Sequence, residues 1–261
     1  MESSELISLL LFFITIDAFA SSSLMISSHR GLVAEDQVGE NQYKAIKEAV
    51  DLGVDYIELD LQVSRDGVVF LYHDFFFESV ANKIAQINKL SYQEIKKKIP
   101  LVTTLDVVIR DFPRQALHLN PKNFTKDHVE KLINTLNSRG RNLDSSIYWG
   151  NQKVFKSLKQ LGLNYFISNY TQAKQCHLVV EKNIFIFLLG ILPLECTSFK
   201  AISFVDYGTI FEASIRNKVL VENGIDPWFL YTRRYKDRNL KWARSSGYKG
   251  IITSIIKKEL L

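Results

Sequence analysis

Two carboxylates stand two residues apart in an apolar segment in the first quarter of the chain. Glu58 and Asp60 lie within the segment 56–61, YIELDL, in which the residues beside them are apolar. Side chains of a β-strand alternate between two faces, so Glu58 and Asp60 share one face. Two like charges on an apolar strand destabilise a fold unless a cation lies between them. The pair therefore predicts a polar site that holds a metal ion or another cation.

Two further apolar segments end in histidine. His29 and Arg30 follow the apolar segment 24–28, and His73 follows the segment 68–72. An imidazole can donate or accept a proton near neutral pH, and a guanidinium can bind two phosphate oxygens at once. Strands that each end in ionisable side chains indicate one polar site on a rigid sheet.

Short apolar runs alternate with helical periodicity from residue 24 onward. We expect strands at 24–28, 54–61, 68–72, 116–119, 145–148, 165–168, 184–189, 201–205, 228–232 and 250–253. We expect helices at 41–52, 92–98, 105–111, 126–139, 151–161 and 236–246. This alternation predicts a parallel sheet covered by helices, and about eight such units in about 250 residues is typical of a (β/α)8 barrel. The competing doubly wound sheet would need a glycine-rich loop after the first strand, which ends in His-Arg-Gly instead.

The connection between the second and third expected strands is short. It consists of residues 62–67 and contains Asp66-Gly67, a turn signal that is typical of an antiparallel hairpin. We expect a hairpin to put Asp60 and His73 at opposite ends of the sheet. An extended return over about 20 Å would keep both residues on one rim. We therefore predict a parallel third strand that is reached without a helix.

The composition is typical of a folded chain. It has 261 residues, of which 46% are hydrophobic, and this fits one large domain or two small ones. The formal net charge of +5 is spread along the sequence, which argues against a nucleic-acid partner. Cys176 and Cys196 form no CxxC motif, and His177 has no metal-ligand spacing to another residue. A disulfide between the two cysteines is compatible with the sequence but is not required by it.

Residues 1–24 form a leader before the expected single domain at 25–261. The apolar run Leu6–Ile16 precedes a cleavage-like AFA triplet, but no Lys or Arg precedes the run, and it is too short to span a bilayer. The leader is compatible with a segment outside the domain, an export signal or weak anchor, or an added helix. Initiation at Met25 would favour a cytoplasmic location. Retention of residues 1–20 would favour an exported, periplasmic or membrane-associated one.

The order and spacing of the polar residues resemble those of the glycerophosphodiester phosphodiesterases. The elements of this resemblance are His29-Arg30-Gly31, Glu40-Asn41, Glu58-Leu59-Asp60, Asp66-Gly67 and His73-Asp74. It is clearest across residues 25–122 and looser downstream. The resemblance implies a (β/α)8 TIM barrel of the phospholipase-C-like phosphodiesterase type. It also implies a phosphoric diester hydrolase that works with one divalent cation, Mg²⁺ or Ca²⁺.

The resemblance also implies a role for each polar residue. The implied metal ligands are Glu58 and Asp60, the implied acid and base are His29 and His73, and the implied phosphate-binding residues are Arg30 and Lys122. Hard carboxylate oxygens suit Mg²⁺ or Ca²⁺, and an imidazole pair can divide proton donation and abstraction. The sequence does not assign acid and base between the histidines. Asn41 is ambiguous, because it could cap the first helix or contact the site.

Asn120 departs from the pattern of the resembled family. That family usually carries a third metal carboxylate two residues before the lysine, and here this position is Asn120. By strand alternation Asn120 shares a face with His118 and Lys122. Its amide oxygen can ligate a metal but brings no charge, so we expect a weak ligand and a weaker metal site. His118 could add a ligand or simply fill the interior.

The expected reaction is hydrolysis of a glycerophosphodiester-like substrate to an alcohol and a phosphomonoester. For a substrate typical of the family the phosphomonoester is glycerol 3-phosphate. One alternative is a catalytically weak or inactive barrel that binds a phosphodiester or a partner, and another is a phospholipase-type relative that acts on lipid. The expected partner is a small-molecule phosphodiester and not a nucleic acid, with membrane contact only through a retained leader. The head group stays open, and the loop at 75–77, with three phenylalanines, is a candidate to select it.

Overall fold

The structure is a computed structural model in which two compact units are distinguished. It describes residues 23–32, 39–78, 84–122, 124–141, 146–149, 152–160, 166–168, 201–204, 210–231 and 240–253. The first unit takes its described residues from 26–169 and 252–261, and the second from 1–25 and 170–251. Among the described residues, none of the helices combines the length and the apolar character needed to cross a bilayer.

Several expectations fall on residues that the structure does not describe. These are the apolar run in the leader, the expected strand at 184–189, Cys176, Cys196 and His177. The expectation of a single domain at 25–261 stays a prediction.

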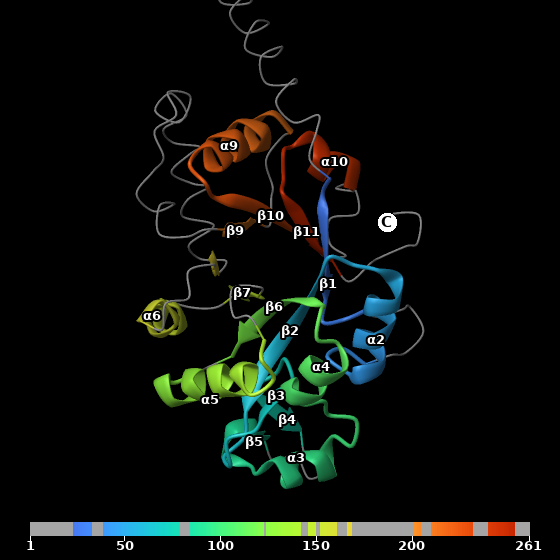
Figure 1. The fold of residues 1–261 in the computed structure, drawn as a ribbon, viewed down its shortest axis with the longest axis vertical. Coiled ribbons are helices and arrows are strands. Elements are labelled where there is room, and N and C mark those ends of the chain that lie inside the picture. The colour runs from blue at the N-terminus through green and yellow to red at the C-terminus, as the bar shows by residue number, and fades with distance from the viewer. Residues whose placement is uncertain are drawn as a thin grey trace, which may run out of the picture. The chain divides into compact units, whose positions relative to one another are not determined.

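Parallel strands form the centre of the first unit. They are β1 (Met25–His29), β2 (Tyr56–Val63), β6 (Ala116–Pro121), β7 (Ser146–Trp149) and β8 (Phe166–Ser168). β2 pairs with β1 on one side and β6 on the other, β6 pairs with β7, and β7 pairs with β8. Figure 1 shows β1, β2 and β6 side by side. Ile57, Leu59 and Leu61 of β2 are fully buried, and so are Glu58 and Asp60 between them, so both faces of this strand lie inside the unit.

Helices of the first unit begin and end near the predicted positions. They are α2 (Tyr43–Leu52), α3 (Tyr92–Lys98), α4 (Leu105–Asp111), α5 (Lys126–Asn137) and α6 (Gln152–Gln160). Ser91 forms the expected capping box with Glu94, and Thr104 accepts a hydrogen bond from the backbone N–H of Val107. Gly53 ends α2 with a φ of 80°, the left-handed conformation that glycine adopts without strain.

The connection after β2 is an antiparallel hairpin, so the prediction of a parallel third strand is wrong. β3 (Val69–Leu71) pairs with β2 in antiparallel register, with Leu61 opposite Leu71. β2 continues beyond Asp60 before the chain turns, and β3 therefore leads the chain back to that carboxylate. The backbone N–H of Tyr72 donates to the carbonyl of Asp60 at 3.0 Å. The hairpin thus returns His73 to Asp60 instead of separating the two residues.

A second, two-stranded sheet follows the hairpin. β4 (Phe76–Glu78) and β5 (Ile84–Gln86) are antiparallel, and Phe76 pairs with Gln86. The short helix η2 (Ile87–Lys89) follows β5 directly. Neither strand was predicted from the sequence, because FFE and IAQ show no alternation of apolar and polar residues.

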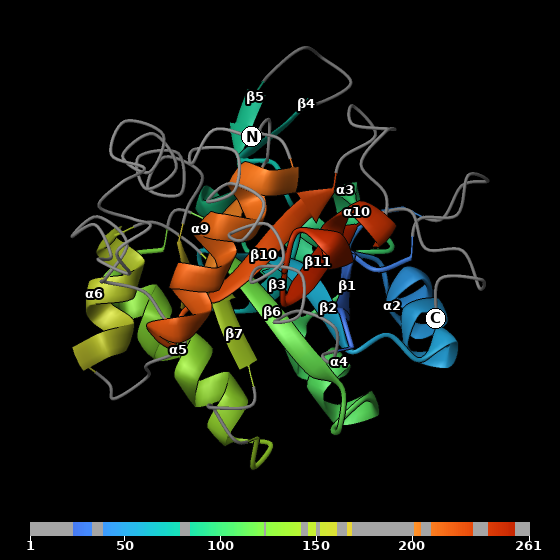
Figure 2. The same ribbon diagram turned by 90° about the horizontal axis from the view of Figure 1, so that it is seen from above.

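The second unit contains a further set of strands and helices. They are β9 (Ala201–Phe204), α9 (Ile210–Glu222), β10 (Asp226–Tyr231), α10 (Leu240–Ser245) and, as far as Ile251, β11 (Gly250–Thr253). β10 is parallel to β9 and hydrogen-bonded to β11, and Figure 2 shows α9 and α10 beside these strands. α9 packs on β10 and was missed by the sequence analysis, since its buried residues form an almost continuous run at 213–220 and no amphipathic stripe.

Candidate active site

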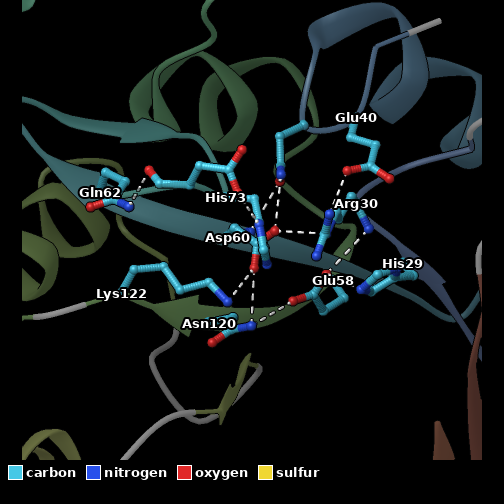
Figure 3. Close-up of polar contacts among 11 residues, drawn as sticks. His29, Arg30, Glu40, Glu58, Asp60, Gln62, His73, Asn120 and Lys122 are labelled. Carbon is cyan, nitrogen blue, oxygen red and sulfur yellow. Dashed lines mark hydrogen bonds and ion pairs between the residues drawn. The ribbon is translucent and has the colours of Figure 1, made fainter. Parts of the chain in front are cut away.

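Asp60 is the centre of a buried cluster of polar side chains (Figure 3). Its Oδ1 lies 2.9 Å from Nζ of Lys122 and accepts a hydrogen bond from Nδ2 of Asn120 at 3.0 Å. Its Oδ2 lies 2.9 Å from Nε of Arg30 and accepts a hydrogen bond from Nδ2 of Asn41 at 3.1 Å. Two cations and two amides therefore converge on a single fully buried carboxylate.

Glu58 is the second fully buried carboxylate of the cluster. Its Oε1 accepts a hydrogen bond from Nδ2 of Asn120 at 3.0 Å, and its Oε2 accepts one from the backbone N–H of Arg30 at 3.2 Å. Nε2 of His29 lies 3.9 Å from Oε2 of Glu58. Because Asn120 also donates to Asp60, its amide group bridges the two carboxylates.

The two carboxylates differ in protonation because their surroundings differ. Burial and the charge of Asp60 raise the pKa of Glu58 to about 8. Burial alone would raise the pKa of Asp60 as well, but the charges of Lys122 and Arg30 hold that pKa below its usual value. At neutral pH the pair therefore carries one proton, on Glu58, and one negative charge, on Asp60.

The turn between β1 and α2 locks Arg30 and Asn41 in place. Both residues have a positive φ, 59° for Arg30 and 61° for Asn41, which is uncommon outside glycine. The backbone N–H of Asn41 donates to the carbonyl of Arg30 at 2.9 Å, and Oδ1 of Asn41 accepts from the backbone N–H of Asp60 at 3.0 Å. Asn41 thus contacts the site, whereas the N-cap of α2 is Gln42, which makes no side-chain cap.

Gly31 explains why the His-Arg-Gly sequence ends in glycine. Its φ is +83°, and a Cβ at this position would lie 2.8 Å from the backbone carbon of Ala45 in α2. A larger residue would push α2 away from the turn that carries Arg30.

The two histidines belong to the same cluster: His29 lies 3.9 Å from Glu58, and His73 follows Tyr72, whose backbone N–H donates to the carbonyl of Asp60. Nδ1 of His73 is 2.7 Å from Oδ1 of Asp74, and the backbone carbonyl of Asp74 accepts a hydrogen bond from Nε2 of Gln62 at 3.1 Å. Burial and the charge of Arg30 lower the pKa of His29 to about 4, and the charge of His73 contributes in the same direction. The imidazole of His29 is therefore neutral at pH 7, the state in which it can accept a proton.

The structure brings the predicted site residues together. Glu58 and Asp60 come from β2 and Asn120 from β6, where Asn120 pairs with Asp60. The remaining predicted residues are His29 at the end of β1, Arg30 after it, His73 after β3 and Lys122 after β6. Gln62 was not predicted as a site residue, although its position two residues after Asp60 on β2 predicts that it shares a face with Asp60.

Glu40 was recognised only as part of the resemblance, without a role. Its carboxylate forms an ion pair with Nη1 of Arg30, whereas Asp60 contacts Nε, so the two carboxylates hold different nitrogens of the guanidinium. Since Arg30 is the residue expected to bind phosphate, Glu40 helps to fix its orientation.

His118 fills the interior of the first unit. It is fully buried, its Nδ1 lies 2.8 Å from Oγ of Ser27, and its ring stacks on Tyr56 at a centroid distance of 4.6 Å. Of the two sequence interpretations of His118, these contacts favour the packing role.

We expect His118 to make the fold sensitive to acid. Burial lowers the pKa of His118 to about 3, whereas an unfolded histidine has a pKa near 6.5. The contribution of neutral His118 to the free energy of unfolding is present above pH 6.5 and is lost as the pH falls toward 3. At pH 5 this loss is about 2 kcal/mol. Urea unfolding at pH 7 and pH 5 should show this extra loss in the wild type and not in His118→Asn. An equal loss of unfolding free energy between pH 7 and pH 5 in both proteins would contradict the lowered pKa of His118.

The donor atoms of the cluster fit a divalent cation. Two buried carboxylates and the amide oxygen of Asn120 are hard ligands of the kind that Mg²⁺ and Ca²⁺ prefer. Two carboxylates and an amide bind a cation more weakly than three carboxylates would. The described residues contain no group of three or more His, Cys, Asp or Glu side chains arranged to hold a metal. Asn120 directs its NH₂ toward both carboxylates, so its amide would have to turn over to offer oxygen to a cation.

Comparison with solved structures identifies the class of fold. A glycerophosphodiester phosphodiesterase from Agrobacterium tumefaciens superposes with a TM-score of 0.62 at 19% identity, over 91% of this chain and 98% of that one. A phosphodiesterase from Oleispira antarctica in complex with the product sn-glycerol-3-phosphate superposes with a TM-score of 0.63 at 15% identity, over 88% and 92% of the two chains. The fold is the predicted (β/α)8 TIM barrel.

Sequence comparison identifies the family. The family model described as "Glycerophosphoryl diester phosphodiesterase family" matches residues 29–161, a range that contains every predicted site residue. The chain belongs to this family, as the sequence predicts. The family is one of phosphoric diester hydrolases that generally depend on a divalent cation.

Relatives found by sequence match this chain over short segments. A glycerophosphocholine phosphodiesterase of Schizosaccharomyces pombe is 33% identical over 86 residues, which are 31% of this chain and 8% of that protein. A glycerophosphodiester phosphodiesterase of Caldanaerobacter subterraneus is 36% identical over 73 residues, which are 28% of this chain and 29% of that protein. The matched part spans less than a third of the length of either relative.

Proposed function

We propose that this chain hydrolyses a glycerophosphodiester-like substrate to an alcohol and a phosphomonoester. The observation that carries this proposal is the convergence of Arg30 and Lys122 on the buried carboxylate of Asp60, with His29 and His73 beside it. The relative that binds sn-glycerol-3-phosphate supports a small-molecule phosphodiester as substrate.

Arg30 and Lys122 would bind the non-bridging oxygens of the phosphate. Their charged groups both lie 2.9 Å from the carboxylate of Asp60, one at each oxygen. The positions of both cations are therefore fixed before the substrate binds. Glu40 fixes the guanidinium of Arg30 in addition. Such fixed cations stabilise the negative charge that builds up on the phosphate in the transition state, at no cost of reorganisation.

Glu58, Asp60 and Asn120 would hold one Mg²⁺ or Ca²⁺. When bound, the cation supplies further neutralisation of the phosphate charge. His29 and His73 would divide the proton transfers: one accepts the proton of the attacking group, and the other protonates the leaving alcohol. Asp74 and Gln62 would fix the position of His73.

We expect Asn120→Glu to tighten metal binding. The substitution places a third carboxylate between two buried ones, so it should destabilise the protein in chelator and raise the affinity for Mg²⁺ by about tenfold or more. Calorimetric titration of Mg²⁺ and melting curves with and without Mg²⁺ measure both effects, and Asn120→Gln is the uncharged control. An affinity equal to that of the control would mean that Asn120 lies outside the metal site.

The experiment that tests the function is turnover of a panel of glycerophosphodiesters by the full chain, with Mg²⁺ or Ca²⁺ and with chelator. We expect release of a phosphomonoester that depends on the cation. The second candidate function is a barrel that binds phosphodiesters with weak or no turnover, and Asn120 in place of a carboxylate favours it. Binding of the diesters without product under any of these conditions would support this candidate and overturn hydrolysis.

A further inference from the structure

Basic and apolar side chains gather at one end of the first unit, on segments that follow the β2–β3 hairpin. Figures 1 and 2 both show α3 beside the small sheet of β4 and β5. The short helix η2 joins them, since it follows β5 directly and its Ile87 lies in one buried cluster with Ile95 of α3. We use the name basic edge for the exposed lysine and apolar side chains of these segments and of the turns beside them: Phe75, Phe76, Lys89, Lys96, Lys97, Lys98 and Leu101.

Lysines give the basic edge a net positive charge. Between residues 86 and 101 the charged side chains are four lysines and Glu94. Glu94 already has a partner, because Nη2 of Arg65 lies 3.2 Å from its Oε2. Arg65 also donates through Nη1 to the carbonyl of Lys89 at 3.2 Å, so it connects η2 to α3. Among the described residues, Lys89, Lys96 and Lys97 form no ion pair, and their charges therefore face solvent.

Large apolar side chains are exposed next to these lysines. Leu101 is 68% exposed, Phe75 is 43% exposed and Phe76 is 47% exposed. They are three of the five exposed large apolar side chains among the residues that the structure describes. Single exposed apolar residues are normal on a protein surface, whereas several on neighbouring segments mark an interaction surface.

The turn after α3 keeps Leu101 exposed. The backbone N–H of Val102 donates to the carbonyl of Ile99 at 3.0 Å, which closes a tight turn that contains Leu101. Ile99 and Val102 both pack against the buried cluster that contains Ile87 and Ile95. Because both ends of the turn are anchored to this cluster, the fold holds a leucine in water directly after a run of lysines.

The two phenylalanines extend the apolar surface toward the proposed active site. The carbonyl of Phe75 accepts a hydrogen bond from the backbone N–H of Ile87 at 3.2 Å, and Phe76 pairs with Gln86 across β4 and β5. Phe75 follows His73 by two residues. A partner that contacts the basic edge would therefore come close to the cluster around Asp60.

An anionic lipid surface fits this combination of side chains. Lysine can keep its ammonium group among lipid head groups, while leucine and phenylalanine enter the boundary between head groups and acyl chains. Each lysine near such a surface strengthens binding by about fivefold. A soluble polyanion would attract the same lysines but would gain nothing from burial of Leu101.

We propose that the basic edge docks this protein on anionic lipid membranes, with Leu101 and Phe76 inserted between the head groups and the lysines on the lipid phosphates. The sequence indicates membrane contact only through a retained leader, whereas the basic edge belongs to the folded first unit. The inference does not depend on the proposed hydrolysis, because docking requires only binding.

Sedimentation of the full chain with lipid vesicles tests this proposal. The partition coefficient is measured for vesicles of phosphatidylcholine alone and for vesicles that contain about one-third phosphatidylserine. We expect the full chain to bind the phosphatidylserine vesicles about tenfold more tightly than the phosphatidylcholine vesicles. This preference should be mostly lost in about 0.5 M salt, where the charges are screened.

Two variants test whether the basic edge makes the contact. Lys96→Gln/Lys97→Gln should weaken binding to the phosphatidylserine vesicles about tenfold, and Leu101→Ser about fivefold. These side chains are exposed, so turnover of a soluble glycerophosphodiester should stay unchanged in both variants. The matched control is Lys47→Gln/Lys156→Gln, which removes two exposed lysines of α2 and α6 and should bind vesicles as the wild type does.

The outcomes separate docking from catalysis. Equal binding of the wild type to both kinds of vesicle, or equal affinity of Lys96→Gln/Lys97→Gln and the control, would overturn docking by the basic edge. A loss in the lysine variant with no loss in Leu101→Ser would also overturn it, and would indicate a soluble polyanion as the partner. None of these results affects the proposed hydrolysis, which is measured on soluble diesters. Vesicle binding without turnover of any diester would overturn hydrolysis and leave docking supported.

Discussion

His29→Ala and His73→Ala should each lower kcat for a glycerophosphodiester by about 10²- to 10⁴-fold, the usual contribution of a general acid or base. Each substitution removes one of the two groups that can transfer a proton beside the phosphate-binding cations. The side chains of His29 and His73 are 21% and 41% exposed, so truncation should leave the fold intact. Steady-state kinetics at pH 7.5 with saturating cation measures the effect.

His118→Asn is the matched histidine control. His118 contacts Ser27 and Tyr56 in the interior and is not among the side chains that converge on Asp60, so its substitution should leave kcat nearly unchanged at this pH. Asp74→Asn should have an intermediate effect of about tenfold, because it only orients His73. A rate in His29→Ala or His73→Ala equal to that of the control would remove that histidine from the mechanism.

Glu58→Gln and Asp60→Asn should change stability in opposite directions, although both should abolish turnover. In the folded chain the pKa of Glu58 is raised to about 8, above the value near 4.3 for an unfolded glutamate. The folded state thus holds a proton that the unfolded state has lost, and stability falls as the pH rises from about 4.3 to 8. Glutamine removes this loss, so we expect a gain on the order of 1–3 kcal/mol at pH 8.

For Asp60 the dependence of stability on pH has the opposite sign. Its pKa is held below the usual value by Lys122 and Arg30, so its contribution to stability is present at neutral pH and is lost only in acid. The substitution Asp60→Asn would leave these two cations without their partner, which should cost about 3–5 kcal/mol at pH 7. Urea unfolding in chelator measures the free energy of unfolding of both variants. A change of the same sign in both would contradict the protonated state of Glu58 or the ionised state of Asp60.

The sequence predicts the features that depend on local patterns. Glu94 follows Ser91 at capping-box spacing, and Gly53 follows the last residue of α2, because caps require particular residues at fixed positions. Glu58 and Asp60 share a face because strand alternation is a property of the backbone. Their chemical types, in order with the two histidines, also identify the family.

Predictions from the sequence are wrong or incomplete where contacts between distant segments determine the structure. The hairpin of β2 and β3 was rejected on the assumption that β2 ends near Asp60, whereas it extends to Val63 and pairs with the returning strand. Asn41 has the composition of a helix cap, yet its amide contacts Asp60, nineteen positions further along the chain. The Asp66-Gly67 turn does signal the hairpin, but the point at which the returning strand meets Asp60 depends on how β2 and β3 pair. The contact between Asn41 and Asp60 has no local signal, because it depends on which segments lie side by side.

The central claim is that the side chains around Asp60 form one site that handles a phosphate. A crystal structure of the full chain with glycerol 3-phosphate and Mg²⁺ tests this claim most directly. We predict that the phosphate lies within hydrogen-bond distance of Arg30 and Lys122, with the cation on Glu58 and Asp60. Phosphate bound away from Arg30 and Lys122 would contradict it.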